Sequence, residues 1–423
     1  MLDIKLIRQN PDLVRAAIKK RNYRFDFEAF LELDQKRRSL QQATEELSAK
    51  QNLIDKEIQG LLKAKQDPKA KIEESRAIKK EAISLQAQFS ELDKQFKSQA
   101  DRIPNIPHSS LPVGGPQANE IIKEVGQKPR FSFKPLDHIA LAENLDLIDF
   151  KRAAKVSGSN FVIFKGLGAR LERALIDFMI DLHAGKHGYS EIIPPKLVNR
   201  ASMRATGQLP NLEEDMYSFP EDNLFLIPTA EVPLTNLHRD EILDEKDLPV
   251  KYVAYTPCFR REAGSYGKDT RGLVRVHEFD KVELVKFVKP ENSYPELEVL
   301  LLEACKILDL LKLSYRINLL ATGDISFAAA KCYDIELYTP GIDKWLEVSS
   351  CSNFEDFQAR RGNIRYRDKK TAKLEFVHTL NGSGLALPRL VVAILENYQQ
   401  KDGSIVVPKV LRSYYGRRKR IQK

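Results

Sequence analysis

The amino-acid sequence predicts an α+β protein: a long antiparallel helical hairpin, followed by a larger domain in which helices flank an antiparallel β-sheet. Three observations support this prediction. Apolar residues repeat every seven positions between about residues 27 and 103. A run rich in Pro and Gly interrupts the chain at residues 104–116. Beyond it, helical stretches alternate with β-rich stretches, a pattern that favours hairpin-connected strands over a parallel βαβ sheet.

The first hundred residues are typical of an antiparallel coiled coil. Residues 1–21 contain a short helix, with its cap and first turn predicted at residues 10–12. Two longer helices follow, at about 27–66 and 68–103. Their heptad positions are Leu33, Leu40, Leu47, Ile54 and Leu61 in the first, and Ile78, Leu85, Leu92, Phe89, Phe96 and Ile103 in the second. The first helix would extend about 60 Å, and so thin an arm cannot enclose a catalytic site.

These patterns divide the chain into four parts. We expect a helical-hairpin arm at residues 1–103, a linker at 104–120, a catalytic domain at 121–410 and a basic tail at 411–423. The last fifteen residues contain seven basic residues and no acidic one. We expect this tail to be disordered rather than to make a specific RNA contact.

Composition excludes several classes of protein. No stretch approaches the ~18 uninterrupted apolar residues of a membrane span, and the first residues lack the apolar core of a secretory signal. Cys258, Cys305, Cys332 and Cys351 stand singly, so reduced thiols in the cytoplasm are predicted, and neither disulfides nor a zinc site is expected. The net charge of +9 suits a polyanionic partner, although ordinary solvated charge is the better explanation of charge alone.

The usual phosphate-binding loops are absent, since the sequence contains neither GxxxxGK[ST] nor GxGxxG between a strand and a helix. A nucleotide would therefore be held by side chains on the sheet. Arg260 and Glu262 lie in a Gly-rich segment, residues 259–272, and should point to one face of an extended chain. The arginine offers a fork of donors to phosphate oxygens, and the glutamate can accept from an amine. A solvated loop is the alternative.

The following strand, predicted at residues 273–287, places Arg275, Lys281 and Glu283 on one face. His277 and Phe279 share that face. A straight strand would separate Arg275 from Glu283 by roughly 26 Å, so a shared site requires a curved strand or an elongated ligand. A core-lining or salt-paired strand face is the alternative.

Two further stretches offer groups suited to a nucleotide. Glu347 and Ser350 follow an apolar strand and are oxygen ligands of the kind that Mg²⁺ accepts beside phosphates; a strand-end cap is the alternative. Arg389 lies in the first turns of an amphipathic helix after residues 381–384, where free N–H groups favour anions. A surface arginine is the alternative there.

Taken together and in this order, these elements resemble the seryl-tRNA synthetase family of class II aminoacyl-tRNA synthetases, along nearly the whole chain. The N-terminal hairpin is similar to that family's tRNA-binding arm, and the larger domain to its catalytic domain. The other matching segments are the arm junction at 103–108, the dimer-forming motif 1 at 188–195, the serine-pocket segments at 206–210 and 229–231, motif 2 at 259–283 and motif 3 at 384–389. Arg261 stands where the family often has a small residue, Glu278 replaces a frequent glutamine, and the basic tail extends past the usual end.

The resemblance implies two sets of binding residues. Serine would contact Thr229, Ala230, Glu231, Glu283 and Ser383. ATP would contact Arg260, Arg261, Glu262, Arg275, Val276, Glu347, Val348, Ser349, Ser350 and Arg389. Within the second set, the catalytic residues would be Arg260, Glu262, Arg275 and Arg389, and Glu347 and Ser350 would hold Mg²⁺.

The resemblance also implies a function. The protein would be a homodimeric ligase that forms seryl-adenylate from L-serine and ATP and transfers the seryl group to the 3′ end of tRNA(Ser), and also of tRNA(Sec). Three alternatives remain open: a relative that loads a carrier protein, a non-catalytic RNA-binding protein of the same fold, and a coiled-coil scaffold. The arm argues against the first, the retained Arg260 and Arg389 against the second, and the organised residues beyond 116 against the third.

Overall fold

The computed structural model describes residues 1–263 and 271–423, so residues 264–270 of the Gly-rich segment lie outside the described residues. The contacts within the chain define two compact units. One consists of Arg24–Pro104. The other combines Met1–Tyr23 with Asn105–Lys423, so the first 23 residues, which we expected to belong to the arm, pack with the larger unit.

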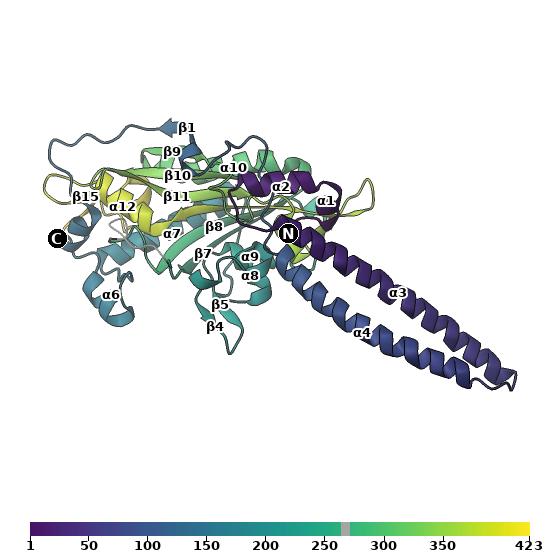
Figure 1. Ribbon diagram of the computed structural model, residues 1–423. Coiled ribbons are helices and arrows are strands. Elements are labelled where there is room, and N and C mark those ends of the chain that lie inside the picture. The colour runs from purple at the N-terminus through teal and green to yellow at the C-terminus, as the bar shows by residue number, and fades with distance from the viewer. Residues whose placement is uncertain (264–270) are drawn as a thin grey trace. The chain divides into compact units, whose positions relative to one another are not determined.

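The smaller unit is a helical hairpin formed by α3 (Phe27–Lys63) and α4 (Lys69–Ala100), which lie side by side along their length (Figure 1). Every expected heptad residue is buried or half-buried. Near the base of the hairpin, the rings of Phe30 and Phe96 stack with their centroids 5.1 Å apart. Arg37 covers Phe96 and forms an ion pair of 3.1 Å with Asp93. The predicted coiled-coil pairing is therefore confirmed.

The larger unit is built on an eight-stranded sheet, in the order β1-β9-β10-β11-β14-β8-β7-β2 (Figure 1). All neighbouring strands are antiparallel except β2, which runs parallel to β7. This confirms the predicted antiparallel sheet. The strands are β1 (Glu120–Val125), β9 (Tyr315–Leu319), β10 (Lys331–Thr339), β11 (Lys344–Asn353), β14 (His378–Ala386), β8 (Glu278–Val288), β7 (Val250–Phe259) and β2 (Ser190–Glu191).

Helices α7 (Leu167–Lys186), α10 (Ser293–Leu311) and α12 (Leu387–Asn397) pack together against one face of the sheet. On β8 this is the face of even-numbered residues. Lys286, fully buried there, forms ion pairs of 3.0 Å with Glu296 and Glu303 of α10. The odd-numbered residues of β8 therefore face the other side of the sheet, where the functional cavity lies.

Shorter elements complete the larger unit. The helices are α1 (Ile4–Gln9), α2 (Pro11–Lys20), α5 (His138–Asn144), α6 (Phe150–Ser157), α8 (Arg200–Thr206), α9 (Glu231–Asn236) and α11 (Phe357–Gly362). The small sheets are β3 (Leu197–Asn199) with β5 (Leu224–Leu226) and β4 (Ser218–Phe219), β13 (Leu374–Phe376) with β12 (Arg365–Arg367) and β6 (Ile242–Asp244), and β15 (Ile405–Val406) with β16 (Arg420–Ile421).

The C-terminal tail is ordered, so our expectation of disorder at residues 411–423 is wrong. Tyr415 is fully buried and donates a hydrogen bond of 2.9 Å to the carbonyl of Leu167. Ile421 is also buried and pairs with Ile405 between β16 and β15. Tyr415 and Ile421 thus anchor a segment whose charged side chains are exposed, except for the half-buried Arg412.

In the described part of the chain, no helix is both long and apolar enough to cross a membrane.

Candidate functional site

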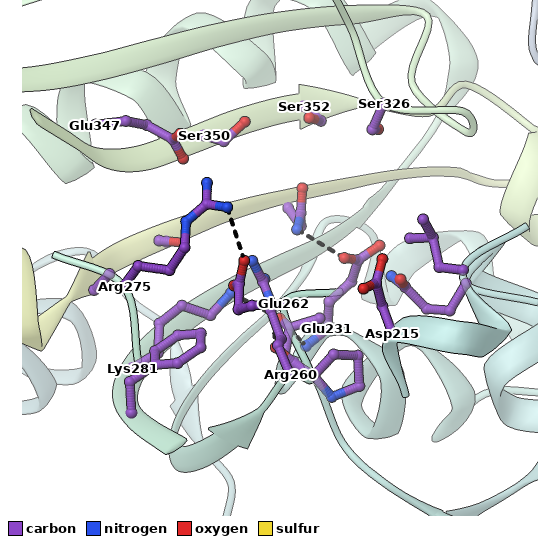
Figure 2. Close-up of a pocket in the computed structure, with 18 of the residues that line it drawn as sticks. Asp215, Glu231, Arg260, Glu262, Arg275, Lys281, Ser326, Glu347, Ser350 and Ser352 are labelled. Atoms are coloured by element: carbon purple, nitrogen blue, oxygen red, sulfur yellow. Dashed lines mark hydrogen bonds and ion pairs between the residues drawn. The ribbon is translucent and has the colours of Figure 1, made fainter. Parts of the chain in front are cut away.

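A cavity of about 610 Å³ lies on the face of the sheet opposite α10. Its floor comes from β8, β11 and β14, and its walls from the start of α12 and from loops far apart in the sequence (Figure 2). Concave, partly polar cavities of this size are typical of small-molecule sites. Most of the residues expected at the site line this cavity: Thr229, Glu231, Arg260, Glu262, Arg275, Val276, Glu347, Val348, Ser350, Ser383 and Arg389.

One end of the cavity is narrow and rich in buried carboxyl and amide groups. Glu231 is nearly fully buried and accepts hydrogen bonds from Gln358, at 2.6 Å, and from Asn381, at 3.1 Å. Lys281 donates to the hydroxyl of Thr229 at 2.8 Å and forms an ion pair of 2.6 Å with Glu283. This end offers a carboxylate, a hydroxyl and an amide within a volume that suits a small polar molecule.

The carboxyl group of Glu231 has a pKa close to neutral pH, so both of its protonation states are populated there. Burial raises its pKa, and the nearby charge of Glu283 raises it further, while the hydrogen bond from Gln358 lowers it. The net result is a pKa of about 7. A cationic ligand at this end would favour the ionised form.

Three arginines line the other part of the cavity. Arg260 donates to the carbonyl of Pro228 at 3.3 Å, and its guanidinium lies 5.3 Å from the ring centre of Phe279. Arg275 forms an ion pair of 3.3 Å with Glu262, as Figure 2 shows. Arg389 lies 3.6 Å from a carboxylate oxygen of Glu347. Two of these guanidinium groups therefore already face carboxylates, which phosphate oxygens can replace as acceptors.

The backbone that presents these arginines differs from the expected extended strands. β8 begins at Glu278 rather than at residue 273, so Arg275 lies on the segment before the strand and not on its face. The separation of roughly 26 Å expected for a straight strand therefore does not apply to Arg275 and Glu283. Glu262 has φ of 51°, a left-handed conformation that ends the alternation beyond Arg260. Both residues nevertheless line the cavity.

Glu347 and Ser350 lie on one face of β11 because the strand is irregular. They are three residues apart and would point to opposite faces of a regular strand. The register against β10 shifts here: Glu347 pairs with Glu336 and Ser349 with Ile335, which leaves Val348 as the extra residue of a bulge. Both side chains consequently line the cavity, and Figure 2 shows them near Arg275.

Glu347 and Ser350 offer oxygen donors of the kind that a cation can take. Asp334 of β10 lies beside them, and burial, followed by the charge of Glu347, raises its pKa to about 8. Crowded carboxyl groups of this kind favour a nearby cation. In residues 1–263 and 271–423, no three acidic, His or Cys side chains gather as a complete metal site. The donor set thus fits Mg²⁺, which typically takes one or two protein ligands and completes its shell with phosphate oxygens and water.

Four expected site residues lie outside the cavity lining. Ala230 is buried in the apolar core with Ala254 and Phe287. Glu283 is fully buried beneath the cavity floor, where it accepts hydrogen bonds from Asn381, at 2.8 Å, and Ser383, at 3.4 Å. The other two are Arg261, whose guanidinium lies 5.1 Å from the ring centre of Tyr217, and Ser349, whose hydroxyl donates to the carbonyl of Ser383.

Several residues that build the narrow end are not among those predicted from the sequence. Lys281 could have been placed at the site from the sequence, because it has the same parity as Glu283 on β8 and so faces the same side. Asn381 could also have been placed there, since it begins the polar run that contains Ser383. Gln358 could not: it comes from the short helix α11, and only the tertiary fold brings its amide to Glu231.

Comparison with known proteins agrees with this architecture. The family model described as the seryl-tRNA synthetase N-terminal domain matches residues 1–107, and the model of the tRNA synthetase class II core domain (G, H, P, S and T) matches residues 216–398. A serine–tRNA ligase of Thermodesulfovibrio yellowstonii is 53% identical over 420 residues, which cover 98% of this chain and 99% of the relative.

Solved structures resemble the whole chain as well. The seryl-tRNA synthetase of Pyrococcus horikoshii, complexed with ATP, has a TM-score of 0.91 and 39% identity, covering 100% of this chain and 99% of that one. The cytoplasmic serine–tRNA ligase of Naegleria fowleri, in complex with AMP, has a TM-score of 0.87 and 28% identity, with the same coverage. From its sequence matches and its fold, the chain belongs to the seryl-tRNA synthetase family.

Proposed function

We propose that this chain is a serine–tRNA ligase that activates L-serine with ATP to seryl-adenylate and transfers the seryl group to the 3′ end of tRNA(Ser). The observation that carries the proposal is the composition of one cavity. Three arginines and an oxygen-rich bulge line one part of it, and a narrow carboxyl- and amide-lined end adjoins them. A triphosphate suits the first part, and a small amino acid with an ammonium group suits the second.

The first step needs alignment and charge neutralisation more than proton transfer. The carboxylate of serine is already ionised at neutral pH, so its attack on the α-phosphorus requires no general base. Arg260 and Arg389 would hold the α-phosphate side, and Arg275 would hold the outer phosphates. Guanidinium groups fixed in a partly dry cavity stabilise the charge that develops on the phosphate oxygens.

Glu347 and Ser350 would hold Mg²⁺ at the bulge of β11. The ion, when bound, would neutralise phosphate charge and help orient the leaving diphosphate. Glu347 also accepts through its carbonyl from Arg389, so the same residue orders an arginine and offers a carboxylate to the metal.

The narrow end would select serine. Glu231 would accept from the ammonium group, and Thr229 and Ser383 would complete the pocket with Glu283 beneath it. Alanine lacks the hydroxyl and would leave a buried polar partner unpaired, a penalty of about 1–3 kcal/mol. Threonine adds a methyl group, worth about 0.8 kcal/mol where there is room, so the pocket must exclude it by shape.

The second step would use the arm. The terminal ribose hydroxyl of the tRNA attacks the mixed anhydride, and AMP leaves. The hairpin of α3 and α4 is too thin for catalysis but suits contacts with RNA shape and backbone through its Lys, Arg and Gln side chains. We include tRNA(Sec) as a substrate of the same reaction.

We also propose a homodimer in the cytoplasm. The dimer would form through residues 188–195, where Ile193 is an apolar side chain with 80% exposure. All four cysteines are free thiols, which suits a reducing compartment. Sedimentation at micromolar concentration tests the dimer: twice the chain mass supports it and a single chain mass contradicts it.

Two assays test the function together. ATP–pyrophosphate exchange with each of the twenty amino acids should proceed with serine alone. Aminoacylation of an unfractionated tRNA pool, followed by identification of the charged species, should yield tRNA(Ser) and tRNA(Sec). Exchange without tRNA charging would favour a carrier-loading relative, and no exchange with any amino acid would leave a binding protein.

A further inference from the structure

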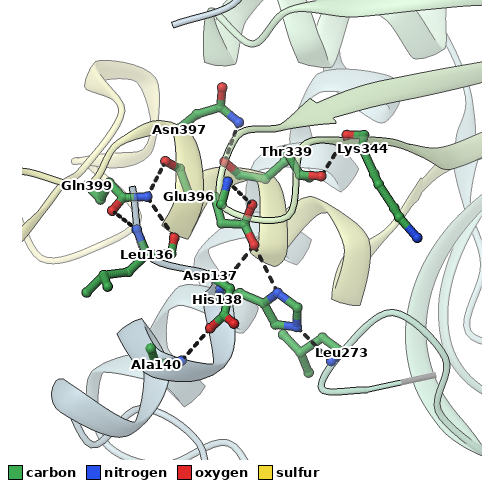
Figure 3. A network of polar contacts seen from close by, with 12 residues as sticks. Leu136, Asp137, His138, Ala140, Leu273, Thr339, Lys344, Glu396, Asn397 and Gln399 are labelled. Atoms are coloured by element: carbon green, nitrogen blue, oxygen red, sulfur yellow. Dashed lines mark hydrogen bonds and ion pairs between the residues drawn. The ribbon is translucent and has the colours of Figure 1, made fainter. Parts of the chain in front are cut away.

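A buried histidine outside the cavity joins three segments of the larger unit (Figure 3). His138, the first residue of α5, is 2% exposed. Its backbone N–H donates to an oxygen of Glu396 at 3.0 Å, and its Nδ1 lies 3.0 Å from the same oxygen. The other oxygen of Glu396 accepts from the backbone N–H of Gly341 at 2.8 Å. Glu396 belongs to α12, the helix whose first turn carries Arg389, and it is fully buried.

The second ring nitrogen of His138 contacts the segment that carries Arg275. The backbone N–H of Leu273 donates to Nε2 at 3.3 Å. Because a backbone N–H can only donate, Nε2 accepts, and the ring proton lies on Nδ1, where it is donated to Glu396. The carboxylate therefore fixes both the tautomer and the orientation of the ring.

The segment of residues 272–276 has two anchors on α12. Leu273 is linked to Glu396 of α12 through the ring of His138. Val274 is linked to α12 directly, because Arg389 donates to its carbonyl at 3.3 Å. Arg275 follows immediately and faces the cavity. With Leu273 and Val274 fixed by these two bonds, the position at which the Arg275 side chain starts is fixed as well.

Gly272 shows that the approach to the ring is close. Its φ is +68°, and a Cβ built on it would lie 2.3 Å from Nε2 of His138. A side chain there would both strain the backbone and displace the ring. The glycine thus allows the backbone to approach Nε2.

We propose that His138 is a positioning residue for the nucleotide triphosphate: it orders residues 272–274 so that Arg275 meets the outer phosphates. The proposal rests on the proposed function. Small displacements of a charged group from a reacting ligand lower the reaction rate. Buried residues that hydrogen-bond to the backbone beside such a group keep it in position. A residue that only fills the core would affect stability without a preference for one substrate.

Two substitutions separate these roles. In His138→Asn the amide reaches the position of Nδ1 but not that of Nε2, so the bond to Glu396 survives and the bond to Leu273 is lost. In His138→Gln the amide reaches the position of Nε2, so an acceptor for Leu273 remains and Glu396 loses its side-chain donor. We expect His138→Asn to raise KM for ATP about tenfold in ATP–pyrophosphate exchange while KM for serine stays unchanged. His138→Gln should restore most of the affinity for ATP.

The control is His378→Asn, at a half-buried histidine whose Nδ1 lies 2.8 Å from the hydroxyl oxygen of Ser293 and which lies outside the cavity. It should change thermal stability without changing KM for ATP. If His138→Asn proves too unstable to assay, Gly272→Ala disturbs the same contact from the other side and should also raise KM for ATP.

Equal KM values for ATP in wild type, His138→Asn and Gly272→Ala would overturn the inference, as would equal increases in His138→Asn and His138→Gln. Both results require an active wild type. A wild type without serine-dependent exchange would instead overturn the proposed function.

Discussion

The raised pKa of Glu231 predicts that serine binding at the narrow end depends on pH. Its pKa is raised to about 7 by burial and by Glu283, whereas serine keeps its ammonium charge throughout the neutral range. The ionised carboxylate is the form that binds a cation. We therefore expect KM for serine to fall about tenfold as the pH rises from 6 to 8, since the ionised fraction rises by that factor. Exchange kinetics at a series of pH values measure this.

Glu231→Gln provides the reference for that profile. It should raise KM for serine and remove the pH dependence, with KM for ATP little changed. The free energy of unfolding should change in the opposite direction. Because the pKa of Glu231 in the folded state lies above the usual 4.5, the folded protein loses about 3 kcal/mol of stability as the pH rises from 4.5 through 7. A wild-type profile as flat as that of Glu231→Gln would contradict the assigned contact.

The residue types of the site could be predicted from the sequence, but not every orientation. Arg260 and Arg389 were recognisable because arginines in segments of matching order resemble motifs 2 and 3. Ala230 and Ser349 were expected at the site, yet they lie behind the lining. A side chain's face depends on where a strand starts and where a bulge falls, and neither can be read from residue type.

The bulge at Val348 determines which side chains of β11 face the cavity. Because it brings Glu347 to the face of Ser350, Glu347→Gln should raise the Mg²⁺ concentration needed for half-maximal exchange by about tenfold. The neutral amide offers a weaker oxygen donor to the metal. A Mg²⁺ titration at saturating ATP and serine measures the change.

Glu336→Gln is the matched control, since Glu336 pairs with Glu347 in the register of β10 and β11 but lies outside the cavity lining. It should leave the Mg²⁺ requirement near that of wild type. A Glu347→Gln protein with an unaltered requirement would place the metal elsewhere.

The tail shows how two apolar residues order a basic segment. Ile421 is 1% exposed, so Ile421→Ala should lower the free energy of unfolding by about 2–4 kcal/mol. Urea denaturation followed by circular dichroism measures the loss. Arg418→Ala, at an exposed position, should change stability by less than about 0.5 kcal/mol. Equal stabilities of the two variants would mean that the tail is not packed.

Elements with a strong period were predictable and weakly patterned ones were not. Seven-residue spacing predicts both arm helices to within a few residues, because the heptad residues form the seam along which α3 and α4 pair. The predicted start of β8 is five residues too early, since Arg275 and His277 continue its alternation although the register of β8 with β7 begins at Glu278. The order of the tail could not be predicted because charged residues dominate its composition, whereas the buried side chains of Tyr415 and Ile421 hold it in place.

In the molecule as a whole, the arm and the cavity belong to separate units. The arm, Arg24–Pro104, forms its own contact unit, while the cavity belongs entirely to the other. The chain leaves and re-enters the larger unit at neighbouring points, since Arg21 donates to the carbonyl of Asn105 at 2.7 Å. A short linker can therefore replace the arm without stretching the larger unit.

Replacing residues 24–104 with a short Gly/Ser linker should leave serine-dependent ATP–pyrophosphate exchange within about threefold of wild type, because no cavity residue is removed. The efficiency of tRNA charging should fall by at least about a hundredfold, since the proposed RNA contacts are lost. Parallel exchange and charging assays measure both. Charging that survives at the wild-type rate would assign tRNA recognition to the larger unit.

The central claim is that side chains on a curved sheet, rather than a glycine-rich loop, hold the triphosphate beneath Arg260 and Arg389. The most direct test is the single-turnover rate of seryl-adenylate formation in Arg260→Gln and Arg389→Gln, with the exposed Arg418→Gln as control. Each of the first two substitutions should lower the rate by about a hundredfold or more, while the control should keep the wild-type rate. Adenylate formation at the wild-type rate in either cavity variant would contradict the account.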